Sequence, residues 1–329
     1  MNISVVVTTY NGKKFIKEQL DSISNQTRKP DEVIILDDCS HDGTGEYVKY
    51  YIEDKRLNNW KLIINKKTVG WKKNFINGFH KAKGSLIFPS DQDDVWDIRK
   101  IEKMSIIMKN KKNIMLLVSN YTPFYEGRSF RRLSGKVIKN MKFDNSVSKI
   151  IFDKNFLSVS RPGCSFCFRN DLLVVLDKLW FEEASHDSAL WRSALLLDGL
   201  FIYNSATMSY RRHERNITNN RIINPLTKIE ETSKFLKTIN NMQGLLDYSK
   251  IKNRDCKRFF INEVKEYYEL KQELYTTGNI FTWCRLIAKY RSYYLSVCSG
   301  LGDLYILLLR ILNNNNNNIK KFFFYNRKV

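Results

Sequence analysis

Apolar runs of strand length alternate with amphipathic segments through the first 120 residues. The runs are nearly continuous and rich in β-branched residues, which is typical of strands that are buried on both faces. They occupy residues 3–10, 32–38, 61–65, 85–91 and 114–120. Segments with apolar residues at helical spacing fill the intervals 13–23, 45–54, 72–84 and 98–110. This alternation predicts an α/β fold, with a Rossmann-like, mostly parallel sheet and helices on both of its faces.

The pattern becomes less regular after about residue 125. The remaining elements that it predicts are a strand at 164–170, helices at 171–180 and 188–199, and an extended segment at 200–213. From about residue 226 the chain is helical in pattern and rich in Lys and Tyr, and six consecutive Asn at 313–318 are predicted to be disordered. We therefore expect an α/β domain over residues 1–220 and a helical, basic C-terminal region over 221–329.

The chain is strongly basic over its whole length. Its 329 residues include 55 Lys and Arg against 34 Asp and Glu, for a net charge of +21. Residues 221–329 hold 19 basic and 9 acidic side chains, net +10, and the rest holds 36 and 25, net +11. Such a charge favours anionic partners, which include nucleotides, nucleic acid and acidic lipid surfaces. Because the charge is not confined to a tail, it does not indicate which of these partners is bound.

The cysteines and the apolar segments indicate the cellular compartment to be expected for the chain. Its six cysteines are scattered, and the single CxxC pair, Cys164 and Cys167, has neither a second pair nor a suitably spaced His pair to complete a zinc site. They are expected to be reduced thiols, as in a reducing cytoplasm. The N-terminus has no secretory signal pattern, and no run of about 18 apolar residues occurs. We expect a cytoplasmic protein, with a peripheral contact at the inner face of the membrane left open.

Polar residues follow three of the predicted strands at the point where each strand ends. The first strand ends in "TTYN", the second in "DDCS" and the fourth in "SDQDD". A turn at Asn11-Gly12 and helix N-caps are local alternatives for the three motifs. A single cap does not require the three carboxylates Asp91, Asp93 and Asp94, however. Ligands of open α/β sheets bind outside the carboxyl ends of the strands, so the coincidence indicates one binding site.

The residue types at these ends suit a metal and a nucleotide. Carboxylates are hard oxygen ligands for Mg²⁺ or Mn²⁺, which commonly bridge carboxylates to substrate phosphates. Tyr10 and Asp38 could bracket a pyrimidine base by stacking and hydrogen bonding. Neither GxxxxGK[ST] nor GxGxxG occurs in the chain, which argues against a P-loop or a dinucleotide-binding protein.

The motifs "VVVTTYNG", "DEVIILDDCSHDGT" and "FPSDQDDVW" resemble, in this order and spacing, the family-2 inverting glycosyltransferases of the GT-A fold. "SDQDDVW" is especially similar to the rhamnosyltransferase subgroup. The resemblance implies a nucleoside-diphosphate sugar donor, dTDP- or UDP-linked, with Thr8, Tyr10 and Asp38 at the nucleobase. Asp91 and Asp93 would match the DxD motif, which holds Mn²⁺ or Mg²⁺ and the diphosphate.

The resemblance extends over residues 1–218 and implies a catalytic base in a second acidic motif. The matching segment is "SHDSALW", in which Asp187 takes the role of the base. Many members have Glu where this chain has His186, and the role of His186 stays open; a helix cap is the structural alternative for the segment.

A late Arg/His motif near the diphosphate matches "YRRHERN" at 210–216. Arg211 and Arg212 would offset the charge of the leaving group, and His213 would ligate the metal or do the same. A solvated basic loop is the alternative for this motif.

Together these residues predict a single displacement that inverts the anomeric carbon. The acceptor would be a hydroxyl of a growing surface glycan or of a lipid-linked saccharide. A nucleotidyltransferase that makes a nucleotide sugar is the main alternative, although its glycine-rich N-terminal loop is missing. A nucleic-acid binder would explain the charge but not "SDQDD", and no nucleic acid is expected as a partner. The aromatic, basic C-terminal region predicts contact with an anionic membrane surface or, equally, internal packing or a homo-oligomer.

Overall fold

The computed structural model describes residues 1–126, 141–213, 224–294 and 300–311. These residues divide into two compact units. The first comprises residues 1–152, 158–219 and 250–252, and the second comprises 153–157, 220–249 and 253–329. The Asn run at 313–318, the end of the "YRRHERN" motif and Cys298 lie outside the described residues.

The first unit is built on one sheet, for which nine strands are found among the described residues. In chain order they are β1 (Ile3–Thr9), β2 (Glu32–Asp37), β3 (Trp60–Ile64), β4 (Leu86–Ser90), β5 (Val95–Trp96), β6 (Leu116–Tyr125), β7 (Val147–Lys149), β8 (Phe166–Arg169) and β9 (Leu200–Arg212). Their order across the sheet is β3-β2-β1-β4-β8-β6-β9-β5, with β7 also paired to β9. Strands β3, β2, β1, β4, β6 and β9 run in one direction, whereas β8, β5 and β7 run in the other.

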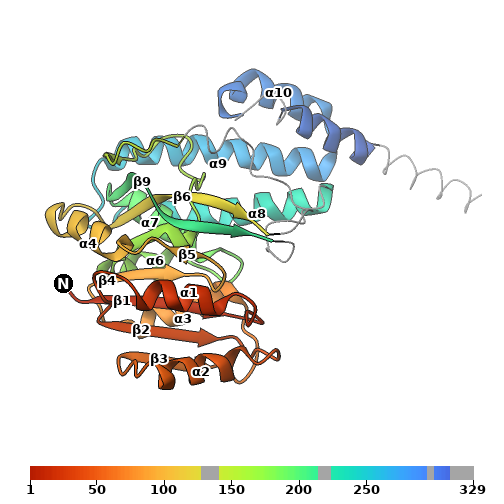
Figure 1. The fold of residues 1–329 in the computed structure, drawn as a ribbon. Helices are drawn as coiled ribbons and strands as arrows, with labels where there is room; N and C mark the ends of the chain where they lie inside the picture. The colour runs from red at the N-terminus through yellow and green to blue at the C-terminus, as the bar shows by residue number, and fades with distance from the viewer. Residues whose placement is uncertain (127–140, 214–223, 295–299, 312–329) are drawn as a thin grey trace, which may run out of the picture. The chain divides into compact units, whose positions relative to one another are not determined.

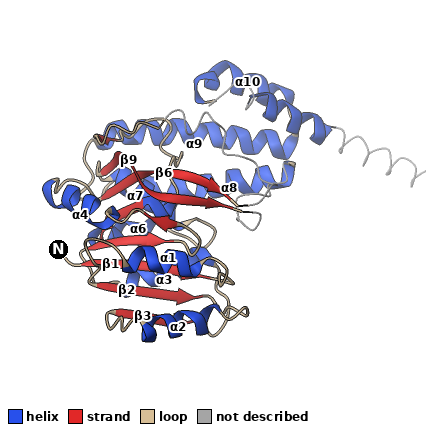
Figure 2. Ribbon diagram, in the orientation of Figure 1, coloured by secondary structure: helices blue, strands red, loops and turns tan. Residues whose placement is uncertain are grey.

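Helices lie on both faces of this sheet (Figures 1 and 2). They are α1 (Ile16–Ser24), α2 (Thr44–Asp54), α3 (Trp71–Lys81), α4 (Lys100–Asn110), α6 (Leu173–Leu179) and α7 (His186–Leu196). The predicted α/β fold with a mostly parallel sheet is therefore confirmed. Strands β5 and β7 were not predicted, because segments of two and three residues carry no measurable periodicity.

The parallel register brings the polar strand ends to one edge of the sheet. The central valines Val5 and Val7 of β1 are fully buried, as continuous apolar runs in a covered sheet should be. Thr9 of β1 pairs with Asp37 of β2, and Val7 pairs with Ser90 of β4. Consequently "TTYN", "DDCS" and "SDQDD" all leave the sheet on the same side, as the sequence predicted.

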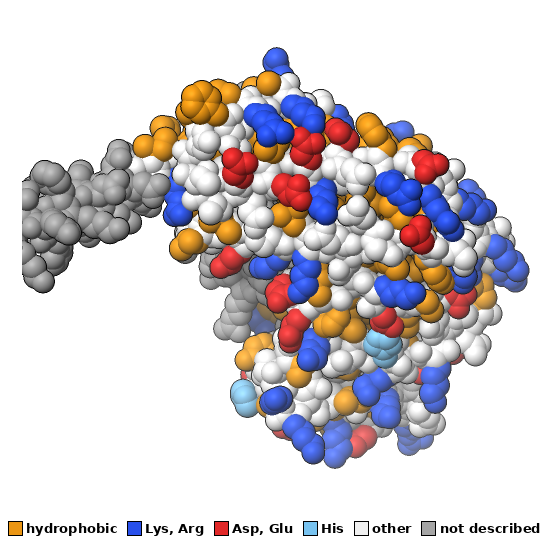
Figure 3. Space-filling view, turned by 180° about the vertical axis from the view of Figure 1, so that it is seen from behind, with side chains coloured by type: hydrophobic (Ala, Val, Ile, Leu, Met, Phe, Trp, Pro, Cys, Tyr) orange, Lys and Arg blue, Asp and Glu red, His pale blue; other side chains and the backbone are white. Residues whose placement is uncertain are grey.

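The second unit is helical in its described part, with α8 (Pro225–Gly244), α9 (Arg254–Thr277), α10 (Ile280–Tyr290) and a further helical segment at 300–311. Its apolar core includes Leu274, Leu286 and Leu307. Basic side chains are common on the face drawn in Figure 3, with acidic and apolar ones between them. Within the described ranges, no helix is long and apolar enough to cross a bilayer.

His186 begins α7 and is buried in an aromatic environment on α3. Its ring centroid lies 3.9 Å from that of Phe75 and 5.6 Å from that of Trp71. Gly163 permits this packing, because a Cβ atom at that position would lie 2.6 Å from Nε2 of His186. Neither ring nitrogen has a hydrogen-bond partner among the residues that the structure describes. Burial lowers the pKa of His186 to about 4, so the ring is neutral at physiological pH.

This buried ring should make the fold sensitive to acid. Below pH 6.5 the unfolded chain protonates His186 whereas the native state does not, so native stability falls as pH falls from about 6.5 toward 4. Between pH 7 and pH 5 the loss should be about 2 kcal/mol. We expect His186→Gln to reduce the pH dependence of the free energy of unfolding, measured in urea, by this amount.

His80 is the control, since its side chain is exposed and lies 3.0 Å from Asp177. His80→Gln should leave the loss at acid pH in place. An unchanged pH dependence in His186→Gln would show that the imidazole is not held neutral.

Candidate active site

The end of β2 is organised by two buried aspartates. Both oxygens of Asp37 accept hydrogen bonds, from the Thr9 and Ser40 hydroxyls and from the Ser40 amide. Asp38 accepts from Nδ2 of Asn65 and from the backbone amides of Val69 and Gly70, each at 2.8 Å. The carboxylate predicted at the nucleobase therefore also fixes the 65–70 loop.

Thr8 and Tyr10 lie at the adjacent end of β1. Thr8 is buried, whereas the Tyr10 side chain is exposed and accessible for stacking. Gln92 holds this end from the acidic loop, because its Oε1 accepts from the Tyr10 amide at 2.8 Å and its Nε2 donates to the Tyr10 carbonyl at 3.1 Å. A Cβ atom at Gly12 would lie 2.1 Å from Oε1 of Gln92, so a larger residue there would displace the Gln92 side chain. Gln92 was missed by the sequence analysis, since only its contacts distinguish it from a surface side chain.

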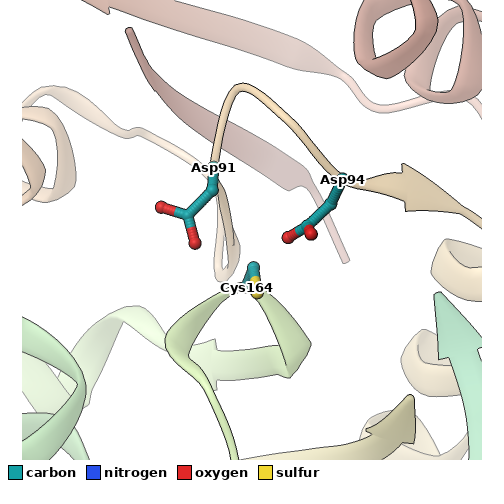
Figure 4. Close-up of side chains that lie close together, drawn as sticks. All are labelled: Asp91, Asp94 and Cys164. Atoms are coloured by element: carbon teal, nitrogen blue, oxygen red, sulfur yellow. The ribbon is translucent and has the colours of Figure 1, made fainter. Parts of the chain in front are cut away.

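The loop between β4 and β5 carries the three aspartates. Asp91 and Asp94 extend from its two ends, with Cys164 from another segment beside them (Figure 4). One ligand atom from each of these three residues lies within 4.8 Å of the others. Asp94 is fully buried; its Oδ1 accepts from the Arg211 amide at 3.0 Å, and its Oδ2 has no hydrogen-bond partner among the described residues.

Burial and mutual repulsion make these carboxyl groups difficult to ionise. Burial, followed by the neighbouring charge of Asp93, raises the pKa of Asp91 to about 7. The same two causes raise the pKa of Asp94 well above its usual range. Burial and the two aspartates also raise the pKa of Cys164, which keeps it a thiol. A protonated thiol is a poor ligand for a hard cation, so the useful donors are the carboxylates.

Lys100 supplies a buried positive charge next to this cluster. Its Nζ donates to the Cys164 carbonyl at 2.6 Å and lies 4.3 Å from the ring centroid of Trp96. Burial lowers the pKa of Lys100 to about 8, against the opposing effect of Cys164, Asp94 and Asp91. The sequence analysis assigned Lys100 only to a helix. A lysine in the first turn, where the helix dipole favours acids, was the available signal.

Asp93 is turned toward β9 and pairs with His213. The Nε2 atom of His213 lies 2.7 Å from Oδ2 of Asp93, and its ring stacks on Phe15 at 4.7 Å. The structure therefore brings together two of the three predicted metal ligands, Asp93 and His213. The third, Asp91, is grouped with Asp94 instead. The charge of Asp93 still acts on both Asp91 and Asp94, as their raised pKa values indicate.

Arg211 binds the acidic loop from β9. Its Nε donates to the Asp93 carbonyl at 2.7 Å, and its two terminal nitrogens pair with Glu18 at 2.6 Å and Glu126 at 3.0 Å. These contacts bury the guanidinium and give it a structural role, which the sequence analysis did not foresee because both acids are distant in sequence. Arg212 is buried as well. Whether either arginine contacts a donor stays a prediction.

Asp187 lies in the first turn of α7, where its Oδ1 accepts from the Ser188 amide at 2.7 Å. A Cβ atom at Gly163 would lie 3.1 Å from Cβ of Asp187, so the start of α7 packs against the residue preceding Cys164. The charge of Asp187 is also among the causes that raise the pKa of Asp91. The proposed base and the acidic loop, 96 positions apart by number, are thus neighbours in the fold.

The acidic loop has the donor set that a hard divalent cation needs. Asp94 has a buried oxygen without a partner in the described part of the chain, and Asp91 has a pKa raised to about 7. Both observations indicate carboxylates that would gain from a nearby cation. Asp91 and Asp94 therefore fit a hard divalent cation such as Mn²⁺ or Mg²⁺, and Asp93 stays a predicted ligand.

Comparison with known sequences identifies relatives of this chain. The dTDP-rhamnosyl transferase RfbG of Shigella flexneri is 29% identical over 223 residues, which cover 64% of this chain and 72% of the relative. An uncharacterised glycosyltransferase of Methanocaldococcus jannaschii is 34% identical over 224 residues, covering 65% of this chain and 72% of that one. The Escherichia coli enzyme WfgD, a UDP-Glc:alpha-D-GlcNAc-diphosphoundecaprenol beta-1,3-glucosyltransferase, is 27% identical over 67% of this chain and 80% of its own.

Solved structures with the same fold include S. aureus TarS residues 1–349 in complex with UDP. It superposes with a TM-score of 0.54 at 18% identity, over 82% of this chain and 71% of that one. The mannosyltransferase PcManGT of Pyrobaculum calidifontis, in complex with GDP-Man and Mn²⁺, gives a TM-score of 0.51 at 15% identity, over 95% of this chain and 86% of its own.

The family model "Glycosyl transferase family 2" matches residues 4–173, which is more than half of the chain and includes the polar ends of β1, β2 and β4. Together with the GT-A fold of the structural neighbours, this match shows that the chain belongs to glycosyl transferase family 2.

Proposed function

We propose that the protein is an inverting, metal-dependent transferase that moves a hexose, with rhamnose the first candidate, from a dTDP- or UDP-linked donor to a saccharide hydroxyl. The observation that carries the proposal is the convergence of Asp187 and the Asp91–Asp94 loop at one edge of the sheet. A base beside a cluster that binds a diphosphate is what a displacement at the anomeric carbon requires.

The donor nucleotide would lie across the ends of β1 and β2. The exposed ring of Tyr10 supports stacking on the base, and Thr8 and Asp38 are the neighbouring polar groups. Asp38 would read the base while keeping its bonds to the 65–70 loop. A pyrimidine nucleotide is favoured because the names of two relatives specify dTDP-rhamnose and UDP-Glc as donors.

The diphosphate would lie over the acidic loop. Asp91 and Asp93 are the proposed ligands of Mn²⁺ or Mg²⁺. His213 would be a third ligand or the partner of Asp93. Asp94 is the buried carboxylate next to Asp91. Such a cation, when bound, would stabilise the negative charge of the departing nucleoside diphosphate. Lys100 would offset part of the negative charge of the buried carboxylates before the donor arrives, and Arg211 would hold their loop in place. Arg212 stays a candidate for the diphosphate.

The chemical step is a single displacement. Asp187 accepts the proton of the acceptor hydroxyl as its oxygen forms a bond to the anomeric carbon from the face opposite the leaving group. The bond between the anomeric carbon and the diphosphate oxygen breaks, and the oxygen keeps the electron pair. The nucleoside diphosphate then leaves. One displacement inverts the anomeric configuration.

The acceptor is proposed to be a glycan or a lipid-linked saccharide. Leu301, Tyr305 and Leu308 follow one face of the segment 300–311 and are exposed. In a basic unit, an exposed apolar stripe of this kind supports contact with an anionic lipid surface, where a lipid-linked acceptor would be found.

Asp187→Asn should abolish transfer while retaining the donor. Loss of a general base reduces the rate by about 10²–10⁴-fold, and the Kd for UDP or dTDP should change less than about twofold because the proposed role places Asp187 at the acceptor hydroxyl and not at the nucleotide. The assay follows release of nucleoside diphosphate with a dTDP- or UDP-sugar.

Asp177→Asn is the matched control, since Asp177 lies on the exposed side of α6 and pairs with His80. Full activity in Asp187→Asn would remove Asp187 from the role, and release of pyrophosphate in place of nucleoside diphosphate would indicate a nucleotidyltransferase.

Removal of divalent ions should stop transfer. After dialysis against EDTA we expect activity to be lost and then restored by Mn²⁺ or Mg²⁺, because the diphosphate leaving group would lack its counter-charge. Asp91→Asn should not be restored, whereas Asp97→Asn, just beyond the loop and bonded to Lys103, should behave as the unaltered protein does. Undiminished transfer in EDTA would contradict the metal assignment.

A further inference from the structure

Arg161 lies on the segment that leads to Gly163 and is held in one orientation. Its Nε donates to Oδ1 of Asn120 at 2.9 Å, and its Nη1 donates to the Ser160 carbonyl at 2.8 Å. Asn120 is itself fully buried in β6, and its Nδ2 donates to the Lys142 carbonyl. The remaining nitrogen, Nη2, makes no hydrogen bond with a described residue, so the fork has one edge available.

No carboxylate of the described residues pairs with this guanidinium. Burial lowers the pKa of Arg161, and among the described residues the Tyr121 phenol opposes the shift. Two other buried cations of this unit differ in this respect: Arg211 pairs with Glu18 and Glu126, and Lys100 lies in the field of Asp91 and Asp94. Because a partly buried charge is costly without a counter-ion, Arg161 is suited to an anion that comes from outside the chain.

The register of the sheet gives the position of Arg161 relative to the acidic loop. Phe168 of β8 pairs with Ile87 of β4 on one side and with Leu116 of β6 on the other. Ile87 and Leu116 are therefore two strand spacings, or about 10 Å, apart. Asp91, just past the end of β4, and Asn120, at an irregularity of β6, each follow four residues further along and lie toward the same end of the sheet.

The order of the strands assigns Arg161 to the acceptor side. The nucleotide ends belong to β2 and β1, the acidic loop follows β4, and β6 lies beyond it. Arg161 is also two residues from Gly163, the residue against which Asp187 packs. It thus lies on the side of the proposed base that is away from the nucleotide.

We propose that Arg161 is a binding residue for an anionic group, phosphate or carboxylate, on the acceptor saccharide. The planar guanidinium, fixed by Asn120 and Ser160, presents its free edge to an oxyanion. The proposal rests on the proposed function, since it takes Asp187 as the base, and it adds that the acceptor carries negative charge near the attacking hydroxyl.

Phosphate binding to the nucleotide-loaded protein tests the proposal. The protein is saturated with UDP or dTDP and Mg²⁺, and inorganic phosphate is titrated while its ³¹P line width is followed. We expect Arg161→Gln to weaken phosphate binding at least tenfold and Arg161→Lys, which keeps the charge but not the fork, to weaken it less. The Kd of UDP and dTDP, measured by calorimetry, should change less than twofold in both variants.

Lys149→Gln, at an exposed position of β7, controls for general loss of positive charge and should bind phosphate normally. Acetate is then used to displace the bound phosphate. Displacement at an acetate concentration below that of phosphate indicates that a carboxylate is preferred, and displacement only at a higher concentration indicates a phosphate. Both results support the site. Unchanged phosphate binding in Arg161→Gln would overturn the proposal, as would a tenfold loss of nucleotide affinity, which would assign Arg161 to the donor. Failure of the unaltered protein to bind either nucleotide would count against the proposed function instead.

Discussion

The site depends on one electrostatic constraint, which is the concentration of Asp91, Asp93 and Asp94 in a loop where burial penalises charge. Two parts of the fold place compensating side chains next to these carboxyl groups. Lys100 contributes a buried cation beside the cluster, β9 contributes Arg211, and His213 directly follows β9. Without a divalent ion the loop keeps a carboxylate with a raised pKa and an oxygen without a partner in the described chain. The remaining strain is what a metal and a diphosphate would relieve together.

Residues around the loop fix its position relative to the end of β1 and the start of α7. Gln92 ties the loop to the end of β1, so the proposed nucleotide end and metal end are fixed to each other. Gly163 allows α7 to approach closely, which brings Asp187 to the loop and buries His186 against α3. The proposed base, metal loop and nucleotide end are thus positioned at one edge of the sheet, and a displacement reaction would gain much of its rate from such positioning.

The sequence predicted the features that are local and left out those that are not. Long apolar runs fixed β1, β2 and β4, and parallel pairing then made their polar ends converge without further information. Lys100, Gln92 and Arg161 were missed because their partners are 64, 82 and 41 positions away. The place of Lys100 in the first turn of a helix is a weak local signal, and the neighbourhoods of Gln92 and Arg161 contain none. The roles of the three aspartates could not be separated for the same reason, since Arg211 and His213 differentiate them through β9.

The central claim is that metal and donor compensate the same buried charge, so each should strengthen the binding of the other. The most direct measurement is the affinity for Mn²⁺, followed by electron paramagnetic resonance, in the absence and in the presence of UDP or dTDP. We expect the nucleotide to tighten Mn²⁺ binding at least tenfold, with Mn²⁺ tightening nucleotide binding by the same factor. Equal Mn²⁺ affinity with and without nucleotide would contradict the account.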